Sequence, residues 1–259
     1  MRYHLDTIPL WDAMRLNSEC PLCAIRRKVE LTDVERFLGG SVMEPDTRIQ
    51  VNDKGFCKHH HGMLFNEHNK LGHALLLHTY LCKTQEKLNA IFKNTENDIH
   101  EKNRRTLSHY IKHTDEPKQD KLARSASEIK AIYQSCIICD SIDNNMIRYA
   151  RTFLHLWDTN EDFKQVFSTS KGVCVPDTAL LMHWAYKEIR QANLSEFVSV
   201  LIERQQENLK RIEDEIRFFT LKFDYRYSDE PWGDSRSAIE RVINKLYGWC
   251  IGDEPNPKK

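Results

Sequence analysis

The sequence predicts an all-α protein of two homologous helical modules, with a long amphipathic helix in the C-terminal part. Each module is expected to be organised around one metal ion held by a C-x-x-C and a C-x-x-H/D motif. Three observations support this class. Glycine is scarce, with 9 in 259 residues, and alternating β-branched runs are rare. Six of the 8 cysteines fall into two matching sets. Apolar residues also recur at steps of three and four over 198–223, which is typical of a helix with one apolar face.

The two cysteine sets have the same order and nearly the same spacing. The first is CPLC followed by GFCKHH, and the second is CIIC followed by GVCVPD. The second and third cysteines are 34 positions apart in one set (23 to 57) and 35 in the other (139 to 174), and the sets are offset by 116 positions (20 to 136). This period is too long for a solenoid. We therefore expect two related modules, 1–113 and 128–259, joined by a polar linker at 114–127.

Each module is expected to hold one metal ion. A C-x-x-C turn brings two sulfurs to one ion, and a C-x-x-H at a helix start adds a sulfur and an imidazole. The alternative is that the thiols are buried in two similar cores. A thioredoxin-like redox role for CPLC lacks the surrounding βαβ pattern. The predicted ligands are Cys20, Cys23, Cys57 and His60 in the first module, and Cys136, Cys139, Cys174 and Asp177 in the second.

Zinc is the expected metal, because sites with three cysteines and one histidine commonly hold structural zinc. An iron–sulfur cluster is the alternative, since the ligands and their spacing also suit one. In the run of three histidines, the spacing from Cys57 and the alignment with Asp177 both select His60. Asp177 itself is either the fourth ligand or only a helix N-cap. We expect the second site to retain metal, but more weakly.

The segments between the motifs are expected to be helical. Apolar positions after CPLC recur at helical spacing, and a long helix is expected to begin after His60, with leucines at 71, 75, 76 and 81. His73 is interpreted as a packing residue rather than a ligand. Cys82 and Cys250 have no partners in the sequence, and we expect both to be small buried hydrophobes.

The most regular predicted helix lies in the second module. One face of this helix is apolar except for a single polar residue, and charged residues flank it; we call this face the seam. The helix therefore either packs through the seam on the rest of the chain or pairs two copies in a coiled coil through 194–223. The seam covers only about four heptads, which favours packing on the same chain. The seam residues are Val198, Ile202, Gln205, Leu209, Ile212, Ile216, Phe219 and Phe223.

The stretch FDYRYSDEPWG follows this helix and differs from its surroundings in being both aromatic and charged. One interpretation is a loop that seals the edge of the core with Trp232. The other is the lip of a polar, aromatic ligand pocket.

Composition excludes several classes of function. Lys plus Arg and Asp plus Glu are 38 each, so net charge gives no attraction to nucleic acid or an anionic membrane. The cluster KNRR at 102–105 has no interleaved aromatics, so nucleic-acid binding is a poor candidate. No apolar run is long enough to span a bilayer, and the first residues lack the layout of a signal peptide. We expect a cytoplasmic protein, in which thiols stay reduced.

The sequence contains no G-x-S-x-G, no phosphate-binding glycine loop and no H-E-x-x-H. The expected function is therefore that of a metal-stabilised binding or scaffold protein, with an unknown protein or small molecule as its partner. The alternative is a metalloenzyme or redox protein in which the second, Asp-containing site is the reactive centre.

The paired halves CPLC…KGFCKHH and CIIC…KGVCVP, the stretch LGHALLLHTYL and the ending FDYRYSDEPWG…AIERVINKLYG together suggest a family. Over nearly the whole chain they resemble a prokaryotic domain-of-unknown-function family whose members often carry the label of ABC transporter substrate-binding proteins. The chain has no export signal, lipobox or α/β periplasmic-binding pattern to match that label. The resemblance implies a fold and metal sites, but no activity. In this family the second half tends to have histidine where this chain has Asp177.

Overall fold

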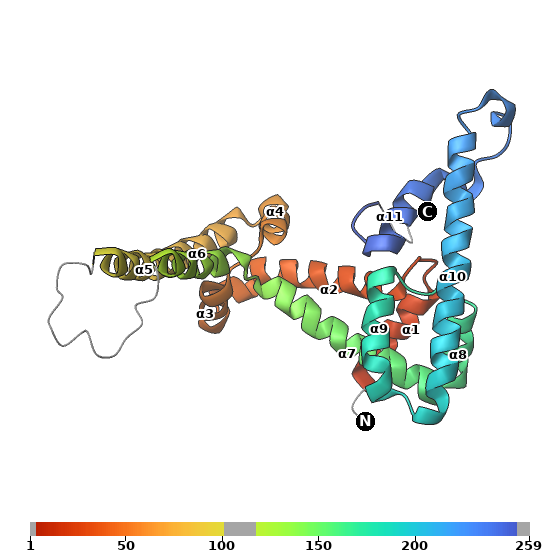
Figure 1. Cartoon of the computed structure of the whole chain (residues 1–259), viewed down its shortest axis with the longest axis horizontal. Helices are drawn as coiled ribbons and strands as arrows, with labels where there is room; N and C mark the ends of the chain where they lie inside the picture. The colour runs from red at the N-terminus through yellow and green to blue at the C-terminus, as the bar shows by residue number, and fades with distance from the viewer. Residues whose placement is uncertain (1–3, 101–117, 253–259) are drawn as a thin grey trace. The chain divides into compact units, whose positions relative to one another are not determined.

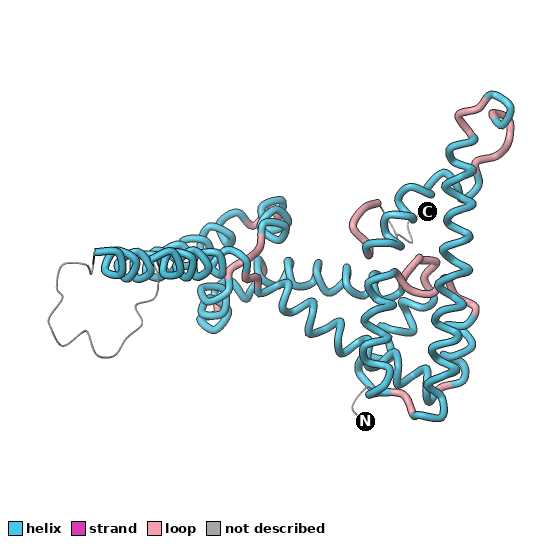
Figure 2. The backbone as a smooth tube through the Cα atoms, in the orientation of Figure 1, coloured by secondary structure: helices cyan, strands magenta, loops and turns pink. Residues whose placement is uncertain are grey.

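The computed structural model describes residues 4–100 and 118–252. Within these ranges the chain is helical apart from turns and short connections, with no strand (Figures 1 and 2), so the all-α prediction is confirmed. The basic cluster at 102–105 lies outside the described residues. The α-helices are α1 (His4–Arg15), α2 (Pro21–Leu38), α3 (Pro45–Lys54), α4 (Lys58–Asn66), α5 (Lys70–His100), α6 (Lys118–Gln134), α7 (Ile137–Thr159), α8 (Glu161–Ser168), α9 (Val175–Glu188), α10 (Gln191–Leu221) and α11 (Ala238–Tyr247).

The chain forms two compact units, and their bounds differ from those of the two predicted modules. One unit contains residues 1–30 together with 142–259, and the other contains residues 31–141. The predicted linker at 114–127 lies partly outside the described residues, and residues 118–134 form α6, which packs on α5. Helices α2 and α7 each cross from one unit into the other. Common ancestry of the two halves stays a prediction.

The unit 31–141 is built around α5, which packs against α3, α6 and the short 3-10 helix η1 (Gly40–Met43). The long helix expected after His60, with its four leucines, is α5, and it begins at Lys70 because a separate short helix, α4, precedes it and the two are separated at 67–69. The Asn69 side chain accepts a hydrogen bond from the Gly72 N–H at 2.8 Å, which satisfies an otherwise unpaired amide at the start of α5. Phe37 and Phe56 meet edge to face, with ring centroids 5.4 Å apart.

The unit 1–30 with 142–259 has an aromatic core. Phe153 lies edge to face with both Phe163 and Phe167, each pair with centroids 5.0 Å apart, and all three rings are buried. Trp157 and Phe197 extend this core from α7 to α10. Helix α10 also packs against α9 and α11, so the long C-terminal helix has partners within its own chain.

The stretch after α10 closes on the end of that helix. The Lys222 ammonium donates hydrogen bonds to the Tyr227, Ser228 and Glu230 carbonyls at 2.6, 2.8 and 2.5 Å. The Trp232 ring lies against that of Phe219 in a tilted arrangement, with centroids 5.5 Å apart and an interplanar angle of 60°, and Trp232 is 37% exposed. The loop therefore packs against the end of α10, and its two interpretations, as a seal of the core edge and as the lip of a ligand pocket, stay predictions.

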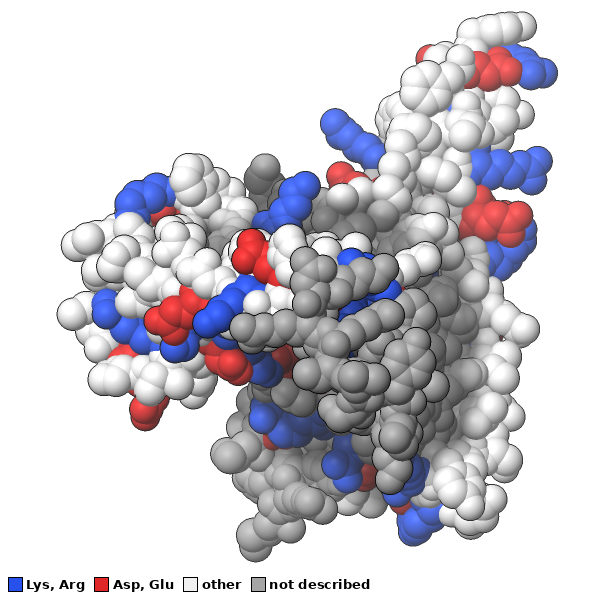
Figure 3. Space-filling model, turned by 60° about the vertical axis from the view of Figure 1, so that its left-hand side comes forward, with Lys and Arg blue, Asp and Glu red and all other residues white. Residues whose placement is uncertain are grey.

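Two further observations concern the surface. On the face shown in Figure 3, Lys and Arg side chains lie next to Asp and Glu side chains instead of forming a basic stripe. None of the described helices combines the length and apolar character that crossing a bilayer would require.

Candidate metal centres

The eight predicted ligands gather into two groups, but the groups exchange partners relative to the prediction. Cysteines 20 and 23 do not share a group with Cys57 and His60, and that pairing is wrong. We call the two sets the Cys3Asp group and the Cys3His group. Within each group the ligand atoms lie within 4.8 Å of one another. The Cys3Asp group is Cys20, Cys23, Cys174 and Asp177, and the Cys3His group is Cys57, His60, Cys136 and Cys139.

Helix N-termini build both groups. Cys20 and Cys136 directly precede α2 and α7, and Cys57 and Cys174 are the N-cap residues of α4 and α9. Each group therefore joins two helix starts, where unpaired N–H groups and the helix dipole favour thiolates. This arrangement explains why the C-x-x-C and C-x-x-H/D spacings recur.

The glycine of the repeated Lys-Gly-x-Cys motif has a backbone role. Gly55 and Gly172 have φ of 65° and 70°, a left-handed conformation that favours glycine. Each turns the chain two residues before an N-cap cysteine. At Gly55 a side chain is also excluded by space, because a Cβ there would lie 2.5 Å from the Tyr80 ring.

The Cys3His group has the dimensions of a shell around one ion. His60 Nδ1 lies 3.2 Å from the sulfurs of Cys57 and Cys136 and 3.5 Å from that of Cys139. The Cys57 and Cys139 sulfurs are 3.7 Å apart. Tetrahedral zinc with bonds of about 2.3 Å to sulfur and 2.0 Å to nitrogen would give edges of roughly 3.8 and 3.5 Å. A cluster of several irons between the thiolates would hold the sulfurs farther apart.

The Cys3Asp group converges in the same way. Asp177 Oδ2 lies 3.2, 3.4 and 3.1 Å from the sulfurs of Cys20, Cys23 and Cys174, and the last two sulfurs are 3.5 Å apart. The N-cap of α9 is Cys174, so the interpretation of Asp177 as that N-cap is wrong. All four side chains are buried. The carboxylate is therefore aimed at the point where a fourth ligand is needed.

Sequence reasoning missed the residues that surround the Cys3Asp group. Arg26 donates to Asp177 Oδ1 at 3.0 Å, which fixes the carboxylate with Oδ2 toward the sulfurs. Arg26 could have been found from the sequence, because it lies three residues after Cys23 and so on the same face of the predicted helix. Trp249 N–H donates to the Cys23 sulfur at 3.3 Å, and a Cβ at Gly248 would lie 3.7 Å from that sulfur. No local pattern links Trp249 to CPLC.

Lys245 is a fully buried cation beside the Cys3Asp group. Its ammonium donates to the carbonyls of Glu19 and Lys171 at 3.1 and 2.5 Å, one residue before Cys20 and three before Cys174. Burial lowers the pKa of Lys245, while Glu19 and the nearby thiols oppose this shift. A divalent ion bound by three thiolates and a carboxylate leaves two net negative charges. Lys245 and Arg26 are placed to offset them.

The thiols of each group titrate unequally. Hydrogen bonds with Cys174 and Cys20 lower the pKa of Cys23 to about 5, whereas burial raises the pKa of Cys20 to about 12. Burial opposes ionisation of Cys136, but His60 and nearby backbone N–H groups lower its pKa to about 6. Burial also raises the pKa of Asp177 to about 7, against the opposing effect of Arg26. In each group the pKa of one cysteine, Cys23 or Cys136, is therefore lowered by its neighbours.

Metal binding to the Cys3Asp group is expected to release protons and to weaken as the pH falls. The Cys20 thiol, and below about pH 7 the Asp177 carboxyl, hold protons that must leave before they can ligate. Calorimetric zinc titrations in buffers of different ionisation enthalpy will measure the release. An apparent binding enthalpy that is independent of the buffer would contradict this expectation.

Among the described residues, the other histidines and cysteines lie outside the two groups. His59 is exposed, and the rings of His61 and His73 stack with centroids 5.9 Å apart. His73 is buried, in line with a packing role. Cys82 and Cys250 are both exposed, so the expectation that they are buried hydrophobes is wrong.

Comparison with known proteins identifies a family and no characterised relative. Residues 1–253 match the profile of a family described as "Family of unknown function (DUF6062)". No curated protein and no solved structure matches the chain.

Proposed function

The chain belongs to the DUF6062 family, whose function is unknown, and from the geometry of the two groups we propose that it is a non-catalytic, zinc-stabilised scaffold or binding protein. The observation that carries the proposal is the spacing of the ligand atoms, which suits one tetrahedral ion per group. Each ion would fasten two helix starts together. We further propose a cytoplasmic location, because thiolate ligands need a reducing compartment.

Zinc is proposed over an iron–sulfur cluster in both groups. Sulfur–sulfur separations of 3.5 and 3.7 Å suit a single ion between the ligands. The burial of the Cys3Asp ligands also argues against a reactive centre, since a catalytic zinc keeps a position open to water or substrate. In the Cys3Asp group the carboxylate would complete a closed shell.

The test is the metal content of the full chain purified without added metal or chelator. We expect one zinc ion per group by elemental analysis, no acid-labile sulfide and no visible absorption band. Cys82→Ser and Cys250→Ser are matched controls, since both cysteines lie outside the groups, and both variants should keep the full zinc content. A brown protein containing iron and sulfide would refute the proposal.

The partner is proposed to be a protein or small molecule, with homodimerisation through 194–223 as one form of association. Ile202 of this segment is 40% exposed and could contact a second copy, whereas Leu201 and Ile212 are already buried within the chain. Light scattering of the parent and of Ile202→Glu will decide it. A parent that is monomeric at high concentration rules out this dimer.

A further inference from the structure

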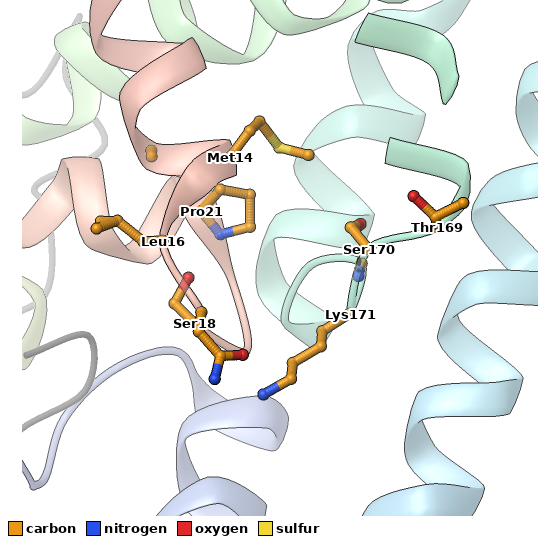
Figure 4. A pocket seen from close by; sticks show the side chains of 10 residues that line it. Met14, Leu16, Ser18, Pro21, Thr169, Ser170 and Lys171 are labelled. Atoms are coloured by element: carbon orange, nitrogen blue, oxygen red, sulfur yellow. Dashed lines mark hydrogen bonds between the residues drawn. The ribbon is translucent and has the colours of Figure 1, made fainter. Parts of the chain in front are cut away.

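The described surface has a pocket and an apolar face that lie outside the proposed zinc centres. The pocket, of about 240 Å³, lies between the α1–α2 loop and the α8–α9 loop (Figure 4). The cation in its lining, Lys171, already lies 3.4 Å from a carboxylate oxygen of Glu19, so it is not a free partner for an anion. The apolar face lies on α5 and α6 in the unit 31–141, and it indicates an interaction.

Most of α5 and all of α6 lack a buried core. In these two helices, all of whose residues are described, α6 contains no buried residue, and the buried residues of α5 end at Leu76 although the helix continues to His100. A helix in a protein gains most of its stability by burying an apolar side against another element. Two helices alone cover only part of each other, so apolar residues from Leu77 onward stay accessible in the single chain.

The contacts between α5 and α6 show which side of each helix faces the other. The Tyr80 hydroxyl of α5 donates to the Ile132 carbonyl of α6 at 3.3 Å. Further along α5, Thr95 Oγ1 donates to Ser125 Oγ of α6 at 2.7 Å. Residue numbers rise along one helix as they fall along the other, so the two helices are antiparallel.

Apolar residues form one stripe on each helix, and both stripes lie on the same side of the pair. At about 100° per residue, each stripe is turned by roughly 60–80° from the line of contact, in the direction of increasing residue number. Because the helices are antiparallel, the same sense of rotation brings both stripes to one side. We call this surface the α5–α6 face, and five of its seven residues are exposed, by 39% to 64%. The residues are Leu77, Leu81, Leu88 and Phe92 of α5, and Leu122, Ile129 and Tyr133 of α6.

The charges of the two helices suit a second copy as the partner. Three cations and three anions between 77 and 134 have no ion-pair partner in the described part of the chain. Since neither sign dominates, these helices do not favour a strongly charged partner, and they do not strongly repel a copy of themselves. The six are Lys93, Lys118, Lys130, Glu96, Asp120 and Glu128.

The size of the face also fits a homodimer. Helix α6 has 17 residues, so at 1.5 Å per residue it is roughly 26 Å long, and two helices side by side are about 20 Å wide. The face therefore covers roughly 500 Å² per copy, and pairing two copies buries about 1,000 Å² in all, near the lower limit of specific interfaces. A reversible dimer is the expected result of an interface of this size.

We propose that the α5–α6 face is a homodimer interface, in which two copies of this helix pair pack face to face as a four-helix bundle. A two-fold axis through the centre of the face makes the contact closed and self-complementary. This surface is separate from the segment 194–223. The inference is also independent of the proposed zinc chemistry, because neither helix contains a residue of the two groups.

The experiment is analytical ultracentrifugation of the full-length, metal-loaded protein from about 1 to 200 µM. The variants are Leu81→Glu and Phe92→Glu, each of which places a carboxylate within the face. Ile49→Glu, at an exposed isoleucine of α3 in the same unit, is the matched control, and Ile202→Glu tests the segment 194–223. Hydrogen exchange of the α5 and α6 amides at both ends of the concentration range locates the interface.

We expect the parent, Ile49→Glu and Ile202→Glu to dimerise with the same Kd, and both variants of the face to raise that Kd at least about tenfold. In the parent, the α5 and α6 amides should be better protected at the higher concentration. Both face variants should fold, because the two side chains are exposed in the single chain.

A parent that is monomeric over the whole range would overturn the proposal, and strong protection of α5 and α6 at every concentration would then show that the same chain covers the face. A dimer weakened by Ile202→Glu and unaffected by both face variants would overturn it in favour of the segment 194–223. If one face variant loses helix content, the other variant and the concentration dependence of exchange in the parent decide the question.

Discussion

Cys136→Ser is expected to unfold the unit 31–141, whereas Cys82→Ser should leave its stability unchanged. Cys136 is one of the four side chains of the Cys3His group, which brings the starts of α4 and α7 together, and a structural zinc ion bound there would contribute on the order of 10 kcal/mol of folding energy, as in small domains. Cys82 is an exposed thiol on α5 of the same unit, so it controls for the chemical change itself. The measurements are zinc content and hydrogen exchange of the α3–α6 amides. Retention of full zinc content and parental protection in Cys136→Ser would contradict the assignment.

Double variants will test how the ligands are paired. Cys57→Ser combined with Cys136→Ser should cost little more than either change alone, because both remove the same ion. Cys57→Ser combined with Cys20→Ser should instead remove both ions, with nearly additive losses. The pairing expected from the sequence predicts the opposite result for these two combinations, so one set of zinc measurements distinguishes the two arrangements.

Lys245→Met is expected to destabilise the unit that contains the Cys3Asp group, by about 3–5 kcal/mol. The change leaves two buried carbonyls, those of Glu19 and Lys171, without their donor and removes a positive charge beside an anionic centre. Lys210→Met, which removes an exposed lysine of the same unit, is the matched control.

Chelator competition provides the specific readout for Lys245→Met. We expect the variant to lose the ion of the Cys3Asp group at lower chelator concentration than the parent, while the Cys3His ion is retained equally. Equal loss from both groups would show general unfolding, and unchanged retention in both would show that Lys245 has no part in holding the ion.

Features that depend on the spacing of nearby residues, namely the helices and the residues of the two groups, could be predicted from the sequence. The scarcity of glycine and the three-four periodicity predicted helices, and the C-x-x-C and C-x-x-H/D motifs selected all eight residues that the structure gathers. It was insufficient for the pairing, because two repeats with nearly equal spacing fit equally well whether each C-x-x-C meets the third cysteine of its own half or that of the other half.

The surroundings of the Cys3Asp group were beyond sequence reasoning for a similar reason. The packing of α11 on α9 and α10 brings Lys245 to the Glu19 carbonyl, next to Cys20, and Trp249 to the Cys23 sulfur. That packing depends on complementary surfaces far apart in the chain, and no short motif records it. The apolar seam of α10 left a similar question open. Its periodicity predicts that this face of the helix is covered, but it does not identify whether the same chain or a second copy covers it.

The exchanged pairing of the ligands has a consequence for biosynthesis. The amino-terminal half leaves the ribosome first, and it presents Cys20, Cys23, Cys57 and His60 before the other half of each group, in residues 136–177, has been made. Those four side chains have the chemistry of a complete zinc shell. An ion captured by this half during translation would hold the nascent chain in a premature arrangement, and it would have to be released when Cys136 and Cys139 emerge. If the two groups bind zinc as proposed, folding of this protein would depend on how fast zinc leaves an early complex as well as on how tightly the finished one binds it.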